Sequence, residues 1–507
     1  MKPLFKSLVS CAILAIASSP ALQAEVRVTQ DYDDQAGLTL FQMTVTPAPE
    51  PVPALRHRLQ LRPIEYKPGN AATYYLRANA ENGLSSTWKG LRDKYGDAID
   101  DWYSHEVPLS ELPIAELREA AAAFDYLVSS FIAPASERRD CDFGYNFSEL
   151  RGGDVYALPL PEAQQSREIC RLLALRTRLA IAEGRYDDAI DCMRMNYRLA
   201  QNVGQEPILV CGLVGVAEVG VTNSTVLELI AAAGSPNLYW ALTELQNPLV
   251  DMRRATSYEM SMISRVFPIL HDAETAEHTA REWARLITQE MATIEDFTNS
   301  MAGTRSLGKH FNNPELVRGL AATGLAMVAY PGAKHRLLAA GMDPERVERM
   351  PVGQVLAIDT AREYQRIADG TEKWWYLPYP LARHRMREAE QELLSKASLE
   401  AGLAPLLADM LMPAVRAGRN AQERIEWQLK AFQVIEALRM HAAETGSFPH
   451  SLDRIQLVPV PQNPVTDQPY LYRLIRGQTA VLELPFSDGM PGVAYRYELK
   501  LEATESP

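Results

Sequence analysis

The chain lacks the short signatures by which common enzyme classes are recognised. It contains no G-x-S-x-G elbow, no H-E-x-x-H helix, no P-loop and no G-x-G-x-x-G turn. Enzymes that depend on these motifs are therefore excluded, although active sites assembled from distant residues leave no motif at all. We assign no catalytic residue, expect no cofactor, and favour a non-enzymatic role while enzymatic activity stays open.

Cysteine is scarce, with five in 507 residues, and no pair has C-x-x-C spacing. That spacing is needed for a thioredoxin-like redox motif and is typical of structural zinc sites, so both are disfavoured. Four cysteines lie beyond the N-terminal leader and can either form disulfides, with three alternative pairings, or stay as buried thiols. These four are Cys141, Cys170, Cys192 and Cys211.

The chain also has fewer positive than negative charges, and few long apolar runs. The formal net charge is −13, which disfavours binding to nucleic acid or to anionic lipid because both would repel the protein. Beyond the leader, the apolar stretch at 208–217 is broken by Glu218, and the stretch at 319–330 ends at Pro331. Neither reaches the ~20 residues that span a bilayer, so we expect no transmembrane segment in the mature chain.

The first residues have the layout of a secretory signal peptide. Two lysines precede an apolar run at 8–17, and small residues follow it. We expect cleavage after Ala24, with Ala21 as the alternative, and a periplasmic or secreted location. A lipoprotein box ending at Cys11 is a weaker alternative, because the apolar run continues past that cysteine.

Patterning predicts a mainly α fold of irregular helical hairpins, solenoid-like or bundle-like, with a small C-terminal α+β module. Residues 38–46 alternate as a strand, with Phe41 and Met43 on one face, before a proline-rich linker. Strand-like segments return only near the C-terminus, after a long helix. The predicted parts are a signal peptide at 1–24, an extended segment at 25–67, a helical domain at 68–425, and a helix with a small antiparallel sheet at 426–507.

One helical hairpin carries a resemblance to a known repeat. Residues 170–203 hold a turn glycine, Gly184, followed by Tyr186 and the small Ala189. This resembles a single tetratricopeptide-type hairpin, in which small residues let the two helices approach closely. No clean 34-residue period continues on either side, so the resemblance implies one hairpin and not a regular array.

Two further resemblances cover the ends of the chain. Residues 442–449 and 467–472 are similar to the globular part of type II secretion pseudopilins. Pseudopilins need a transmembrane helix directly before this module, and soluble sequence stands there instead, so neither filament assembly nor a calcium site is carried over. Segments 53–75 and 235–242 resemble uncharacterised secreted helical proteins of planctomycete type, which implies a location and an architecture but no chemistry.

One polar cluster has metal-like spacing. His271, Glu274 and His278 are separated by three and four residues, which would place all three on one face of a helix. Imidazole and carboxylate groups are suitable ligands for zinc. The alternative is a solvated helix face, which shows the same spacing.

The densest aromatic segment, at 374–380, is a candidate ligand site. Aromatic rings beside prolines can form a rigid platform for a sugar or a peptide, while the alternative is a loop that plugs the helical core. The candidate residues are Trp374, Trp375, Tyr376, Tyr379 and, on a polar rim, His384.

These patterns favour a periplasmic helical scaffold that binds another envelope protein. Stacked helical hairpins form extended surfaces suited to protein contacts. The alternative is an envelope enzyme, or a binder of small ligands or polysaccharide, with a pocket among the helices. A scaffold should present a large exposed apolar patch, whereas a ligand binder should hold a pocket with polar groups inside.

Overall fold

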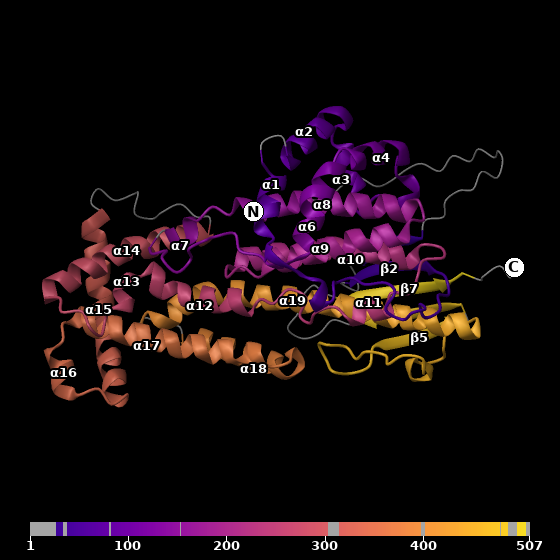
Figure 1. Ribbon diagram of the computed structural model, residues 1–507. Helices are drawn as coiled ribbons and strands as arrows, with labels where there is room; N and C mark the ends of the chain where they lie inside the picture. The colour runs from indigo at the N-terminus through magenta and orange to yellow at the C-terminus, as the bar shows by residue number, and fades with distance from the viewer. Residues whose placement is uncertain are drawn as a thin grey trace.

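The computed structural model describes residues 27–33, 38–80, 83–152, 154–302, 314–396, 401–476, 478–484 and 494–502. In these residues the protein is mainly helical with a small mixed sheet at one end, which confirms the predicted fold class (Figure 1). The long helices run along a common direction and give an elongated molecule (Figure 1). The predicted signal peptide lies outside the described residues.

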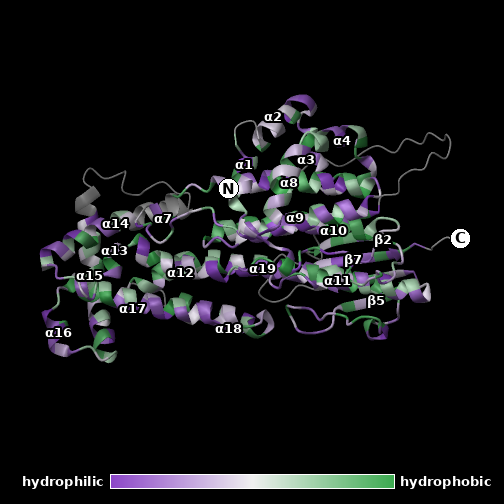
Figure 2. Cartoon of the chain, in the orientation of Figure 1, coloured by the Kyte–Doolittle hydropathy of each residue, from purple (hydrophilic) through white to green (hydrophobic). Residues whose placement is uncertain are grey.

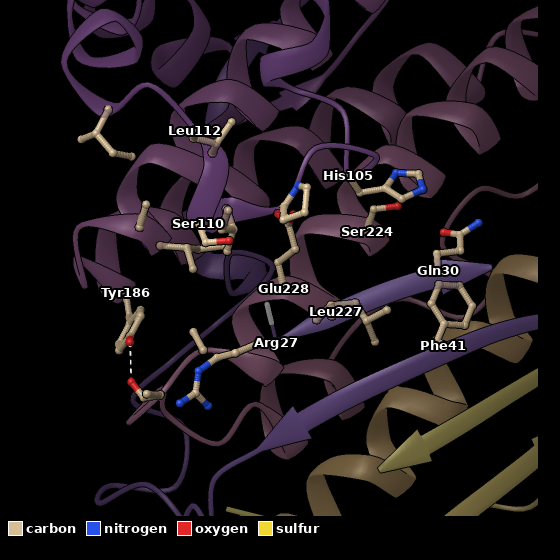
Figure 3. Close-up of a pocket in the computed structure, with 18 residues that line it drawn as sticks. Arg27, Gln30, Phe41, His105, Ser110, Leu112, Tyr186, Ser224, Leu227 and Glu228 are labelled. Atoms are coloured by element: carbon tan, nitrogen blue, oxygen red, sulfur yellow. Dashed lines mark hydrogen bonds between the residues drawn. The ribbon is translucent and has the colours of Figure 1, made fainter. Parts of the chain in front are cut away.

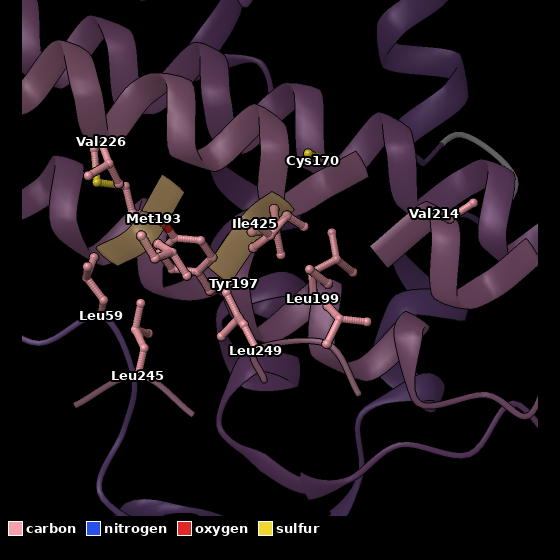
Figure 4. Close-up of a cluster of buried hydrophobic side chains, with 14 of the residues drawn as sticks. Leu59, Cys170, Met193, Tyr197, Leu199, Val214, Val226, Leu245, Leu249 and Ile425 are labelled. Atoms are coloured by element: carbon pink, nitrogen blue, oxygen red, sulfur yellow. The ribbon is translucent and has the colours of Figure 1, made fainter. Parts of the chain in front are cut away.

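The wider end of the molecule holds the N-terminal helices and the sheet. Three long helices, α8, α9 and α10, pack on one another there. Their apolar side chains, among them Met193, Tyr197 and Val226, form part of the main core (Figure 4). The helices of this part are α1 (Ala72–Ala78), α2 (Leu84–Tyr95), α3 (Ala98–Trp102), α4 (Ile114–Ala122), α5 (Asp125–Leu127), α6 (Ala133–Ser136), α8 (Pro161–Ala182), α9 (Tyr186–Gly204), α10 (Leu209–Ala231) and α11 (Tyr239–Thr243). Helix α7 (Asp154–Ala157) lies toward the narrower end, where it contacts α12 (Figure 1).

A helical hairpin forms where the sequence predicted one. Helix α8 ends at Ala182 and α9 begins at Tyr186. The turn between them contains Gly184 at a φ of +72°, a backbone conformation that side chains other than glycine rarely adopt. The turn glycine of the sequence pattern therefore has a conformational reason.

Helix α10 is more apolar than the sequence analysis expected. Its 23 residues are long and apolar enough, by length and composition, to cross a membrane, and apolar residues dominate it in Figure 2. In the structure 61% of its most apolar window is buried, and it packs against α8, α9 and α19. Core helices of water-soluble proteins pass the same test, because a helix covered on several sides is apolar all round.

The narrower end has its own small core. Trp283, Leu337 and Ile358 are buried in it, separate from the main cluster. The helices of this end are α12 (Arg253–Val266), α13 (Pro268–His271), α14 (Ala280–Ala302), α15 (Pro314–Ala339), α16 (Pro344–Arg349), α17 (Val352–Glu372) and α18 (Tyr379–Lys396).

Helix α19 (Ala404–Thr445) connects the two ends. Its 42 residues span about 63 Å at 1.5 Å per residue. Pro405 lies in its first turn, whereas Pro413 lies inside the helix, which continues through it. The predicted boundary between 425 and 426 falls within this helix.

The sheet joins both ends of the chain. Its strand order is β1 (Val28–Asp33), β2 (Leu38–Val45), β7 (Tyr495–Leu501), β6 (Thr479–Leu484) and β5 (Leu471–Arg476). Strands β2 and β7 are parallel, and the other neighbours are antiparallel. The N-terminal strands, which the sequence analysis placed in a separate extended segment, therefore belong to the sheet of the C-terminal module. A short second sheet pairs β3 (Lys67–Asn70) with β4 (Arg138–Asp140).

Alternation along β2 fixes which face meets the helices. Phe41, Met43 and Val45 are buried while Gln42 is exposed, as the predicted strand pattern required. Phe41 stacks on Tyr497 of β7 with ring centroids 5.0 Å apart. Because β1 and β2 also contact α10, the sheet edge and the helical layer enclose space between them.

Candidate functional site

A cavity of about 570 Å³ lies between the sheet edge, the ends of α8 and α10, and the loop that connects α3 to α4 (Figure 3). This volume falls in the range typical of small-ligand sites, ~300–1,000 Å³. The side chains that line it come from several distant segments: Arg27, Val28, Gln30, Phe41, His105, Pro108, Leu109, Ser110, Leu112, Ile114, Ile181, Ala182, Tyr186, Ser224, Leu227, Glu228, Ala232 and Ala233.

Most of the lining is apolar and held in place by the fold. Phe41 lies at the cavity while its ring stacks on Tyr497, so its orientation is fixed. Leu227 is buried on α10, and Ile181 is buried in the last turn of α8. An apolar wall of fixed side chains favours a ligand with an apolar body, because both surfaces leave water on contact.

Glu228 is the acidic side chain of the lining, and a buried arginine compensates it. Arg178 lies behind it, with its Nε atom 3.1 Å from each carboxylate oxygen and no exposed surface. Burial raises the pKa of Glu228, and the guanidinium of Arg178 opposes that rise. A buried charge without such a partner would cost several kcal/mol, so this pair has to be formed for the site to exist.

The same arginine also positions the loop above the cavity. Its Nη1 atom donates to the carbonyl oxygen of Trp102 at 2.7 Å, and its Nη2 atom donates to that of Val107. These bonds fix both sides of the loop that carries His105 into the lining (Figure 3). Burial lowers the pKa of His105, so its imidazole is neutral at pH 7 and can both donate and accept a hydrogen bond.

The other charged group, Arg27, is compensated as well. Its Nη2 atom lies 2.6 Å from a carboxylate oxygen of Glu502, and its Nη1 atom donates to the carbonyl oxygen of Ala231 at 3.3 Å. Tyr186 donates its hydroxyl to the carbonyl oxygen of Ala233 at 2.5 Å, and burial raises its pKa. The charges at the cavity are therefore neutralised by the protein itself, which favours an uncharged ligand.

The polar groups do not form a nucleophile–base pair. Ser224 donates to the carbonyl oxygen of Gly220 at 3.2 Å, within its own helix. Across the described lining, no hydrogen bond joins a serine hydroxyl to His105 or Glu228. Acyl transfer by an activated serine needs such a contact.

The aromatic segment predicted as a ligand platform is split between two environments. Trp375 is buried, with 2% of its surface exposed, and Arg419 lies over its ring at 5.1 Å. Trp374 lines a different cavity, with Lys373 over its ring at 4.8 Å. A sugar platform with both tryptophans exposed is therefore not formed, because the short helix Lys373–Tyr376 turns the two rings apart.

The remaining predicted residues of that segment also diverge. Tyr376 is exposed and Tyr379 is buried. Tyr379 lines a cavity between α18 and α19, whereas His384 is exposed on α18. Of the five predicted residues, Tyr379 and Trp374 thus reach cavities, and they reach separate ones.

The predicted metal residues do not share a helical face. Helix α13 ends at His271, and residues 272–279 are not helical. Glu274 pairs with Arg362 at 2.7 Å, and His278 packs against Trp283 with ring centroids 5.4 Å apart. In the described part of the chain, no group of three or more histidine, cysteine or acidic side chains is placed to hold a metal ion. The spacing argument was wrong because it assumed a continuous helix.

Of the two alternatives left open for the cysteines, disulfides or buried thiols, the structure has buried thiols. Cys141, Cys170, Cys192 and Cys211 are all free and buried. Burial raises the pKa of Cys192 to about 11, so its thiol stays protonated and unreactive near neutral pH.

Sequence reasoning missed the residues of the main cavity for a clear reason. They come from several segments between Arg27 and Ala233, including strands β1 and β2, the loop between α3 and α4, and helices α8, α9 and α10, so no local pattern unites them. A weak signal was available: Glu228 interrupts an apolar run in α10, and Arg178 interrupts one in α8. A charged residue on an otherwise buried face requires a partner of opposite charge, so these two positions indicated an ion pair but gave no sign of a cavity.

Comparison with known proteins gives no assignment. No protein-family model, no curated protein and no solved structure matches this chain. The function therefore has to be argued from the geometry of the cavity.

Proposed function

We propose that the protein binds a small uncharged amphipathic molecule in the cavity between the sheet and α10. The observation that carries the proposal is an apolar cavity of about 570 Å³ whose charged side chains are already paired within the protein. A charged ligand would have to compete with these pairs, whereas an apolar body needs only to displace water.

The polar groups of the lining define the rest of the ligand. Gln30, His105, Ser110 and Ser224 offer neutral donors and acceptors at the rim of the apolar space (Figure 3). Such groups orient a ligand that carries hydroxyl or amide functions. Together with the predicted signal peptide, a cavity of this kind supports a role as a ligand-binding protein of the cell envelope.

The test uses the neutral dye N-phenyl-1-naphthylamine, whose fluorescence rises when it leaves water. Ser224→Trp fills the cavity with a large ring, and we expect it to abolish the saturable dye binding of the wild type. Ser395→Trp is the matched control, because Ser395 also donates to a carbonyl oxygen of its own helix but is exposed on α18. We expect dye binding by this control to equal that of the wild type.

A second variant shows whether a loss of dye binding by Ser224→Trp could result from misfolding. Ala182→Trp fills the cavity from the last residue of α8, whose side chain is exposed, so a large side chain there disturbs little packing. Loss of dye binding in both cavity variants, with unchanged melting temperatures, supports the proposal. Equal dye binding in all four proteins overturns it.

The scaffold function expected from the sequence has less support. A protein-binding scaffold should present a contiguous apolar face. In the described residues, the large exposed apolar side chains are distributed over many elements. Examples are Tyr32, Ile64, Tyr126, Met327, Leu381 and Leu471.

A further inference from the structure

The five-stranded sheet has two open edges. In the strand order β1-β2-β7-β6-β5, the first and the last strand each have a neighbour on one side only. In the described part of the chain, no backbone hydrogen bond joins either strand to a segment outside the sheet. Each edge therefore presents a row of N–H and C=O groups that another strand can pair with.

Both edge strands lie at the surface of the molecule. On β5, Leu471 is 54% exposed and Ile475 is 53% exposed, and this strand forms the border of the sheet that faces away from α8, α9 and α10 (Figure 1). On β1, Tyr32 is 54% exposed. The N–H of Tyr32 donates to the carboxylate of Asp31 at 2.7 Å, within its own strand, as expected for an edge group without a neighbouring strand.

The directions of the two edge strands suit pairing with each other. Strand β5 is antiparallel to β6, which is antiparallel to β7, and β7 is parallel to β2. Strand β1 is antiparallel to β2, so β1 and β5 run in opposite directions. When a second copy is placed beside the first in the plane of the sheet, β5 of one copy meets β1 of the next in the antiparallel arrangement, which is the more stable one.

The two edges carry opposite charges on the same face of the sheet. The strand registers connect Arg473 of β5, through one residue of each inner strand, to Thr29 of β1. Residues paired in this way point to the same face, and so does Asp31, two positions after Thr29. Gln30 and Phe41, which line the main cavity, point to the other face.

These charges are not balanced within the chain. The side chain of Arg473 is 71% exposed and lies 4.0 Å from Glu483, whereas Glu483 lies closer to Arg496, at 3.0 Å. One carboxylate therefore serves two guanidinium groups, and a positive charge remains at the β5 edge. Among the described residues, Asp31 accepts its hydrogen bond from the uncharged backbone of Tyr32 and forms no ion pair, so its negative charge remains at the β1 edge.

We propose that copies of this protein associate head to tail, with β5 of one copy pairing antiparallel to β1 of the next. Both strands have six residues, and when they are aligned over their full length Arg473 lies directly opposite Asp31 of the next copy. Opposite charges at such positions stabilise an antiparallel pair. A second copy is the partner that the structure itself supplies, because β1 has the length, the direction and the charge that the β5 edge requires.

The contact is heterologous, because it joins two different edges, so it can repeat along a row of copies. It is also weak. The contact between two short edges is small, and the net charge of −13 on each chain opposes association. We therefore expect reversible association that becomes measurable only at high protein concentration.

Sedimentation equilibrium of the protein at low salt tests the proposal, with a mass that rises with concentration as the expected result. Arg473→Glu places like charges opposite each other at the contact, and we expect the association constant to fall roughly fivefold or more. Lys500→Glu is the control, because it makes the same change of charge at an exposed position of the inner strand β7. Its association constant should stay within about twofold of wild type.

Exchanging the charges tests the pairing itself. Asp31→Arg alone should weaken association as much as Arg473→Glu does. The chain that carries both substitutions should associate within about twofold of wild type, because the opposite charges face each other again. Damage to the fold cannot produce such a recovery. Hydrogen exchange at high protein concentration should slow in β1 and β5 but not in the inner strands.

Four results would overturn the proposal. These are a constant monomer mass of wild type at every concentration, equal losses in Arg473→Glu and Lys500→Glu, no recovery when the two charges are exchanged, and no effect of Asp31→Arg. The last result would indicate a contact between two β5 edges instead. Dye binding to the main cavity is measured at low protein concentration, where the protein is monomeric, so this proposal and the proposed function fail independently.

Discussion

Arg439 shows how single buried residues hold this molecule together. Its side chain has no exposed surface, and all five of its N–H groups have acceptors. It donates to both carboxylate oxygens of Glu436, to the backbone oxygen of Thr46, and to the backbone and hydroxyl oxygens of Ser235. One side chain on α19 thus links the end of β2 to the loop after α10.

Replacing this residue should be costly. Arg439→Met leaves the carboxylate of Glu436 buried without its partner, and we expect the free energy of unfolding to fall by about 3–5 kcal/mol. Arg496→Met is the control, because its pair with Glu483 is partly exposed, and it should cost less than about 1 kcal/mol. Urea unfolding of both variants measures the difference; equal losses would contradict the role given to Arg439.

Glu218 predicts a pH dependence of stability. It is 2% exposed on α10, and burial raises its pKa to about 8. The folded protein therefore favours the protonated form, and stability is lost as pH rises from the unfolded pKa through 8.

Glu218→Gln removes this loss. We expect the variant to be more stable than wild type at pH 9, by up to about 5 kcal/mol, and similar to wild type at pH 4. Thermal unfolding at the two pH values checks this, with Glu116→Gln on the exposed face of α4 as a control. A variant that is no more stable than wild type at pH 9 would show that the carboxylate is accommodated as an anion.

At the level of elements, α9 and α10 pack unusually closely. A Cβ atom added at Gly215 would lie 2.5 Å from the backbone oxygen of Ala200 and 3.0 Å from the Cα atom of Gly204. The two helices therefore meet through backbone atoms and small residues. This close contact holds α10, and with it the residues of α10 that line the cavity, against α8 and α9.

Gly215→Ala should force these helices apart. We expect a loss of about 1–3 kcal/mol in the free energy of unfolding, the cost typical of overpacking. Gly220→Ala, on the same helix with nothing within 4 Å of the added Cβ, should instead stabilise the protein by about 0.5–1 kcal/mol. Chemical denaturation of the two variants should show changes of opposite sign in the free energy of unfolding if the close approach exists, and changes of the same sign if it does not.

Local sequence patterns predicted individual strands and turns well, but they did not predict which strands pair with one another. The alternation at Phe41 and Met43 predicted the strand and its buried face, and Gly184 marked the turn of the hairpin. The pairing of β2 with β7 joins residues at opposite ends of the chain, and nothing local in either strand specifies that partner. The residues that line the main cavity also come from segments distant in the chain, so local patterns identified none of them as site residues.

Errors at the candidate sites came from assuming the wrong local structure. The metal hypothesis required a helix through His278, but α13 ends at His271. The aromatic hypothesis treated Trp374 and Trp375 as one surface, although neighbouring residues in a helix point in different directions. The sequence shows which residue types are present, but the backbone conformation determines which of them lie close together.

At the scale of the whole molecule, the cavity at the sheet and a second cavity between α18 and α19 lie in different parts of an elongated body. The apolar cavity is formed where the sheet meets α8 and α10, and the arginine-lined cavity lies where α18 meets α19 (Figure 1). Helix α19 runs from one part to the other and packs against both α10 and α17. This helix therefore connects the parts of the molecule that hold the two cavities.

The central claim is that the cavity at the sheet holds a small uncharged amphipathic molecule. The most direct measurement is mass spectrometry of small molecules extracted from the protein after purification from its own cells. We predict one apolar compound with hydroxyl or amide groups, near one equivalent per chain, with the wild type and with Ser395→Trp, and its absence from Ser224→Trp. Recovery of the same compound from all three proteins, or of none from any, would contradict the claim.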